Sequence, residues 1–130
     1  MSKHINVYGV SDMTGETVAR IVRAASAQFP TGEVTIKMLQ HISGAQQVID
    51  FIEQQGDAGT PTAVFHTILS PRIRANLRNA LQTLRIPSVD LLGSTAHVIA
   101  SQLDERPETT PGLTIDDGAE PEVFDLAQEG

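Results

Sequence analysis

The sequence predicts an α/β fold: a mainly parallel, four-stranded sheet with helices on both faces. Two observations predict this class. Four short β-rich segments alternate with four segments whose apolar residues recur at helical spacing, and the connections between them are short. Alternation of this kind is typical of parallel sheets buried on both faces, and right-handed crossovers leave few strand orders. We expect a flavodoxin-like or Rossmann-like arrangement with the first strand central.

Two strand–helix units are expected in the first half of the chain. Residues 5–10 are β-rich, and apolar residues at helical spacing predict a helix over 16–28. Residues 34–39 are the second strand candidate. Ser43 is a candidate N-cap for a second helix, whose apolar face lies within 45–52.

Two further units follow. Residues 62–67 predict the third strand, and Ser70-Pro71 is a strong helix start, because a hydroxyl cap precedes proline at the first helical position. Residues 86–92 predict a short fourth strand, and Ser94 is expected to cap a final helix. The apolar residues that we expect this last helix to turn inward are Val98, Ile99 and Leu103.

The charge of the chain is concentrated at one end. Residues 104–130 hold nine acidic residues and one arginine, a net charge of −8, so that the other residues carry +1 and the whole chain −7. We therefore divide the chain into an α/β domain, 1–103, and an acidic, partly disordered tail, 104–130. A nearly neutral domain with few aromatic residues argues against nucleic acid as a partner.

The composition excludes several classes of site. The chain has no cysteine, which rules out disulfides, thiolate zinc sites and a cysteine nucleophile. Its apolar runs are far shorter than the ~20 residues of a membrane span, so we expect a cytoplasmic protein with no membrane partner. The histidines show no metal-ligand spacing, and we assign no metal ligand and no catalytic residue. A homo-oligomer is left open.

The most informative stretch lies between the first strand and the first helix. A helix N-terminus after a strand gathers free amides and the positive end of the helix dipole, which suit a phosphate or carboxylate. The alternative is structural: Thr14 or Asp12 caps the helix, and Gly15 permits a tight turn. The candidate residues for anion or partner binding in this stretch are Ser11, Asp12, Thr14, Gly15, Glu16 and Thr17.

Further candidates follow the other strands. Because ligands of open α/β sheets bind beyond the carboxyl ends of the strands, we add Thr67 and Asp90 to the candidate site. Arg74 on the third helix is a candidate phosphate clamp, with a solvated basic helix face as the alternative. For His66 we favour a partly buried structural role over a general base.

At these positions the chain resembles a known family. VSDMTGET at 10–17 looks like the S-D-S-T-G-E-T signature of pyruvate, phosphate dikinase (or phosphoenolpyruvate synthase) regulatory proteins. The segments AASAQFP at 24–30, Thr67 to Arg74, IPSVDLLG at 86–93 and PGL at 111–113 resemble later segments of the family, in order and at compatible spacing. The resemblance covers the N-terminal half of such proteins.

The resemblance implies a bifunctional regulator. Such proteins use ADP to phosphorylate a threonine of the dikinase or synthase, and use inorganic phosphate to remove that group. Their nucleotide loop lies in the second half of the family, and no loop of that type occurs in this sequence. ADP and phosphate are therefore implied for the full-length family only, and the dikinase or synthase is the implied partner.

Three functions remain open at this point. The chain is a recognition or regulatory domain without catalysis of its own, half of an enzyme that needs a nucleotide-binding domain, or a stand-alone phosphate- or anion-binding domain that does not act on a dikinase. A receiver-like phosphoacceptor is disfavoured because the third strand ends in His66-Thr67, where a receiver needs an aspartate.

Overall fold

The computed structural model describes residues 3–55, 59–109 and 119–126. Strands and helices alternate along the described chain, as the sequence predicts. The elements are β1 (His4–Ser11), α1 (Glu16–Ser26), β2 (Glu33–Leu39), α2 (Ala45–Gln54), β3 (Thr62–Thr67), α3 (Pro71–Thr83), β4 (Ser88–Asp90) and α4 (Leu91–Leu103).

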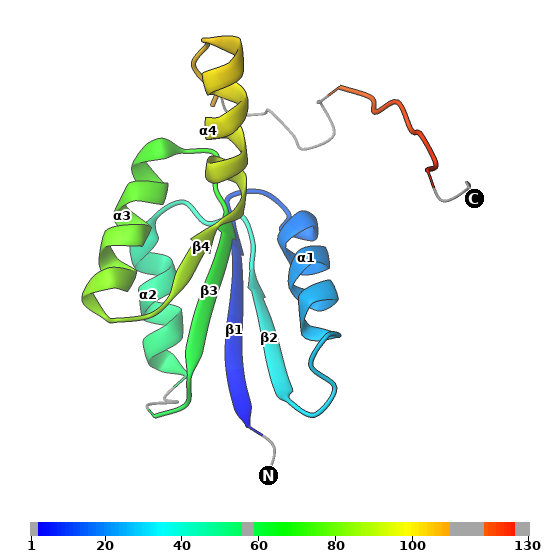
Figure 1. Ribbon diagram of the computed structural model, residues 1–130. Coiled ribbons are helices and arrows are strands. Elements are labelled where there is room, and N and C mark those ends of the chain that lie inside the picture. The colour runs from blue at the N-terminus through cyan, green and yellow to red at the C-terminus, as the bar shows by residue number, and fades with distance from the viewer. Residues whose placement is uncertain (1–2, 56–58, 110–118, 127–130) are drawn as a thin grey trace.

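The strands form one parallel sheet in the order β2-β1-β3-β4 (Figure 1). This is the order of the first four strands of the flavodoxin-like fold, so the predicted fold class is confirmed. The register pairs Ser11 with Thr67 and His66 with Asp90. The loops that follow β1, β3 and β4 therefore meet at the carboxyl edge of the sheet.

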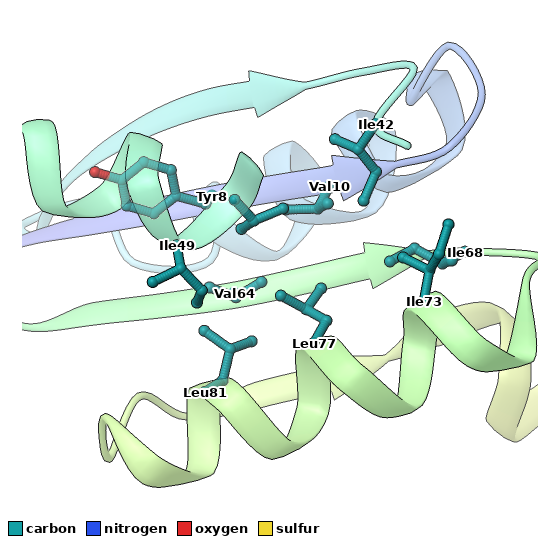
Figure 2. Close-up of a cluster of buried hydrophobic side chains, with 10 residues drawn as sticks. Tyr8, Val10, Ile42, Ile49, Val64, Ile68, Ile73, Leu77 and Leu81 are labelled. Carbon is teal, nitrogen blue, oxygen red and sulfur yellow. The ribbon is translucent and has the colours of Figure 1, made fainter. Parts of the chain in front are cut away.

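The helices cover both faces of the sheet. α2 and α3 lie on one face, over a large cluster of buried side chains (Figure 2). α1 lies on the other face, where Val7, Val18 and Val22 are buried. Most of the apolar core therefore lies between the sheet and the pair α2 and α3. The cluster on that side is Tyr8, Val10, Ile42, Val48, Ile49, Val64, Ile68, Ile73, Leu77 and Leu81.

Local signals set most helix ends. Ser70 caps α3 as predicted, because its Oγ accepts a hydrogen bond from the Ile73 amide at 3.3 Å. The predicted Ser43 cap of α2 is wrong. Gly44 is the N-cap residue, and Gln47 Oε1 accepts hydrogen bonds from the amides of Ser43 at 2.6 Å and Gly44 at 3.3 Å. A side chain inside the helix thus satisfies the two amides that precede α2.

The last helix departs most from the prediction. It begins at Leu91, not after Ser94, because the Asp90 carboxylate caps it by accepting a hydrogen bond from the Gly93 amide at 2.6 Å. Figure 1 shows α4 continuing beyond the carboxyl edge of the sheet, whereas α1, α2 and α3 lie alongside the strands. The apolar side chains expected to point inward are exposed: Val98 by 62%, Ile99 by 55% and Leu103 by 61%.

The tail following α4 is described only in part. Residues 105–109 and 119–126 contain no helix or strand, and Val123, Phe124 and Leu126 are exposed. Within the tail predicted to be partly disordered, residues 110–118 and 127–130 lie outside the described ranges. Among the described residues no helix is long and apolar enough to cross a membrane.

Candidate functional site

The predicted site residues lie near the point where the strand order of the sheet reverses. The chain leaves β1 toward α1 on one face and leaves β3 toward α3 on the other, so the gap between β1 and β3 is the topological switch point of the sheet. Ligands of doubly wound sheets bind at such points. Ser11 and Thr67, the last residues of these two strands, lie side by side in the register there.

Asp12 ties the two loops together. Its carboxylate accepts hydrogen bonds from the amides of Leu69 at 3.0 Å and Ser70 at 3.3 Å, both in the loop before α3. Ser11 Oγ accepts from the Met13 amide at 2.9 Å. Asp12 is therefore not the cap of its own helix α1, which was the structural alternative. It satisfies the amides on the α3 side of the switch point.

The N-terminus of α1 remains open. Its N-cap residue, Gly15, has the left-handed torsion angle φ = +82°, and no side chain makes a capping hydrogen bond there. A Cβ at Gly15 would lie 3.1 Å from Met38 Cε, so both backbone and space call for glycine. Thr14 Oγ1 lies 3.5 Å from the Glu16 amide, at the limit of a hydrogen bond. The Glu16 amide thus has a long side-chain acceptor, and Gly15 has no side chain with which to cap the helix.

The hydroxyl groups at this edge differ in access. Ser11 is fully buried, and Thr67 is 1% exposed with no hydrogen-bond partner for its Oγ1 in the described part of the molecule. Thr14 and Glu16 are exposed, and Thr17 is half-buried. An anion approaching α1 from solvent therefore meets Thr14 and Thr17 first. Ser11 and Thr67 are buried at the ends of β1 and β3.

A second group of polar side chains lies on the α3 side of the edge. Asp90 Oδ2 is 3.6 Å from Arg74 Nε, and Asp90 Oδ1 is 3.9 Å from Nδ1 of the buried His66. A Cβ at Gly93 would collide with both Asp90 and Arg74, so this glycine lets the pair pack against α4. The sequence singled out Asp90 and Arg74 but missed Gly93, although the IPSVDLLG segment contains it.

His66 is held neutral by its surroundings. Burial lowers the pKa of its imidazole, and the positive charges of Arg74 and Arg78 lower it further, while Asp90 opposes them. Nδ1 has no hydrogen-bond partner among the described residues. The predicted structural role of this histidine, in preference to a general base, fits a side chain that solvent does not reach.

The edge opens into a cleft between α3 and α4. The cleft has a volume of about 380 Å³ and is lined by Arg74 and Asp90 on one side and by Gly93, Ala96 and His97 on the other. Within the described ranges no group of three His, Asp or Glu side chains could hold a metal ion. Residues 107–109, which follow α4, also line the cleft, so that its lining holds one arginine, Arg74, and two carboxylates, Asp90 and Glu108.

Both lysines of the sequence lie away from the carboxyl edge of the sheet. Binding of the phosphates of a nucleoside diphosphate calls for a cradle of amides with a lysine or arginine. Lys3 precedes β1 at the opposite edge, and Lys37 Nζ donates to Gln55 Oε1 beyond the end of α2. No other lysine occurs in the sequence.

The fold and the edge define a flavodoxin-like α/β domain whose polar side chains gather at the switch point of a parallel sheet. The chain belongs to the kinase/pyrophosphorylase family, whose model matches residues 7–125. It is similar to a protein of Rhodospirillum rubrum, 37% identical over 125 residues, which cover 91% of this chain and 42% of the relative. It is also similar to one of Citrifermentans bemidjiense, 29% identical over 115 residues, or 88% and 42%.

Both relatives carry the name "Putative pyruvate, phosphate dikinase regulatory protein". A numbered form of that name, ending in 2, belongs to a Staphylococcus saprophyticus relative, 31% identical over 113 residues, which cover 85% of this chain and 41% of the relative. The resemblance that the motifs indicate is confirmed. The chain spans about two fifths of the length of these relatives, so what the whole proteins do remains a matter of proposal for this chain.

Proposed function

We propose that this chain is the recognition or regulatory domain of a dikinase regulator and that it holds a phosphate group at the N-terminus of α1. Its target is a pyruvate, phosphate dikinase or phosphoenolpyruvate synthase. The nucleotide chemistry of the family is carried out by polypeptide outside these 130 residues. Phosphoryl transfer needs an electrostatic cradle for the nucleotide, and these 130 residues contain no glycine-rich loop followed by a lysine.

One observation carries the proposal: α1 begins at the switch point with no side-chain cap of its own. Its first-turn amides and the positive end of its dipole lie where the chain places the exposed Thr14 and the half-buried Thr17. The Asp12 carboxylate is already engaged by amides on the α3 side. These features support an anion at the N-terminus of α1, and phosphate is the anion that the family handles.

The first test is a phosphate titration followed by amide chemical shifts. A single phosphate at such a site binds weakly, with a Kd of about 1 mM, or about −4 kcal/mol. We expect the shifts to centre on Thr14 to Val18. Gly15→Val should weaken binding, because a β-branched residue is strained at φ = +82°.

Gly44→Val is the matched control for that variant. Gly44 is also an N-cap residue, but its backbone is extended and a Cβ there meets no atom within 4 Å. It should leave phosphate binding unchanged. Shifts confined to residues 72–78, or no shifts at all, would mean that the N-terminus of α1 is not an anion site.

The second test concerns the target. Incubation of this chain with a dikinase and labelled ADP should give no phosphorylated dikinase, while the two proteins should associate in a pull-down. Transfer by the chain alone would overturn the proposal that it is a recognition domain. Phosphate binding without any association with a dikinase or synthase would instead identify a stand-alone anion-binding domain.

A further inference from the structure

The surface of α4 is unusual for a helix of a globular domain. Such a helix normally buries an apolar stripe and exposes charged residues on the opposite side. Leu91–Leu103 contains no Asp, Glu, Lys or Arg, and none of its residues is buried. Val98 and Ile99 are more than half exposed. The helix therefore presents uncharged and partly apolar surface to solvent on a large part of its circumference.

The same side of the sheet is also uncovered at β4. Val89 pairs with Phe65 in the register, and Phe65 packs against the cluster under α1. α1 covers the middle of this face, but β4 lies at the edge and Val89 is 46% exposed. Parallel strands are normally covered on both faces. The helix that follows β4 does not return over the sheet, so this part of the face stays open (Figure 1).

These two areas lie on the same side of the molecule. Leu91 packs against the cluster on the α1 side, and Val98 lies on the same stripe of α4 because it is seven residues further along the helix. The cleft-lining residues of α4, such as Ala96 and Ala100, lie on the opposite side. We call the area formed by Val89, Leu91 and Val98 the β4–α4 surface. Ile99 follows Leu92 by seven residues and therefore lies nearer the cleft side of α4.

We propose that the β4–α4 surface is the docking face for the part of a kinase/pyrophosphorylase chain that the match to this chain leaves uncovered. That part is more than half of each of the three relatives. An uncharged, apolar face suits a permanent contact, because obligate interfaces are more apolar than transient ones. A dikinase, which a regulator must bind and release, is better served by the polar carboxyl edge. This inference rests on family membership and does not depend on the phosphate site.

The test compares amide hydrogen exchange in two proteins. One is this chain alone, and the other is this chain continued into the uncovered part of the Rhodospirillum rubrum relative. We expect exchange of the α4 amides to slow by tenfold or more in the continued protein. The amides of α2, which packs with α3 over the main buried cluster, should exchange equally in both proteins. They serve as the internal control.

Two substitutions locate the contact. Val98→Asp in the continued protein should abolish the slowing at α4, because it places a charge in an apolar interface. Val123→Asp is the matched control, since Val123 is 84% exposed and lies outside the β4–α4 surface. A milder Val98→Thr, which keeps the side-chain shape, should give a partial loss and guards against a folding defect.

Several results would overturn the inference. α4 amides that exchange equally fast in both proteins would do so, as would a protection that Val123→Asp removes as well as Val98→Asp. Protection in the chain alone that rises with protein concentration would assign the surface to a second copy. Phosphate titration of Val98→Asp should match that of the unmodified chain, so that failure here and failure of the anion site remain distinguishable.

Discussion

The two faces of the sheet differ in how completely helices cover them. On the face under α2 and α3, the ten side chains of the main cluster close the core from Tyr8 to Leu81. On the face under α1, Val7, Val18 and Val22 are buried, and the area beside β4 stays open. The first face therefore holds the domain together. The second face and the edge next to it remain available for contacts with other molecules.

The largest expected effect lies on the closed face. Leu77 is fully buried between α3 and the sheet, and Leu77→Ala should lower the free energy of unfolding by about 2–5 kcal/mol through lost burial and a cavity. Leu84→Ala, at the exposed end of the same helix, should cost much less. Urea denaturation measures both. Equal losses would mean that the cluster is not the main source of stability.

A smaller loss of stability is expected where Asp12 connects the loop after β1 to the loop before α3. Asp12→Ala leaves the amides of Leu69 and Ser70 without their acceptor and should cost about 1–3 kcal/mol. Asp50→Ala is the control, because Asp50 is exposed and accepts a hydrogen bond from Gln46, four residues earlier on the same helix. If both variants unfold at the same urea concentration, the hydrogen bonds of Asp12 do not couple the loops.

Periodicity and turn chemistry are enough to predict the sheet. The strand segments are short and β-rich, Ser70-Pro71 marks a helix start, and alternation of strands and helices makes the strands parallel. The same logic places Ser11–Thr17, Thr67 and Asp90 at one edge of the sheet. These predictions succeed because they depend on local sequence and on the handedness of crossovers.

The predictions that fail concern contacts between residues that are far apart in the sequence. The apolar stripe of α4 is expected to face inward, but periodicity does not reveal whether a helix returns over the sheet. Asp12 is a plausible local cap by its position, whereas the amides that donate to it lie 57 and 58 residues further along the chain. Such long-range partners cannot be read from spacing.

The pH dependence of stability should report on His66. Because burial lowers its pKa in the folded state, the unfolded chain takes up a proton first as pH falls. The contribution of the neutral imidazole is therefore complete above the unfolded pKa of about 6.5 and is lost as pH falls through the lower folded value. His66→Asn should flatten the stability profile below pH ~6.5, and His97→Asn, at an exposed position, should not. Parallel profiles for the unmodified chain and His66→Asn would contradict this.

The smallest effect is expected on the open face. Val98 is 62% exposed on α4, so Val98→Ala removes little buried surface, and alanine has the higher helix propensity. In the chain alone the free energy of unfolding should change by less than about 0.5 kcal/mol. Urea denaturation in parallel with Leu77→Ala measures the contrast directly. A loss above about 1 kcal/mol, a typical cost of a harmful substitution, would show that Val98 already packs within this chain. The β4–α4 surface would then be part of the core, and no partner would be needed to cover it.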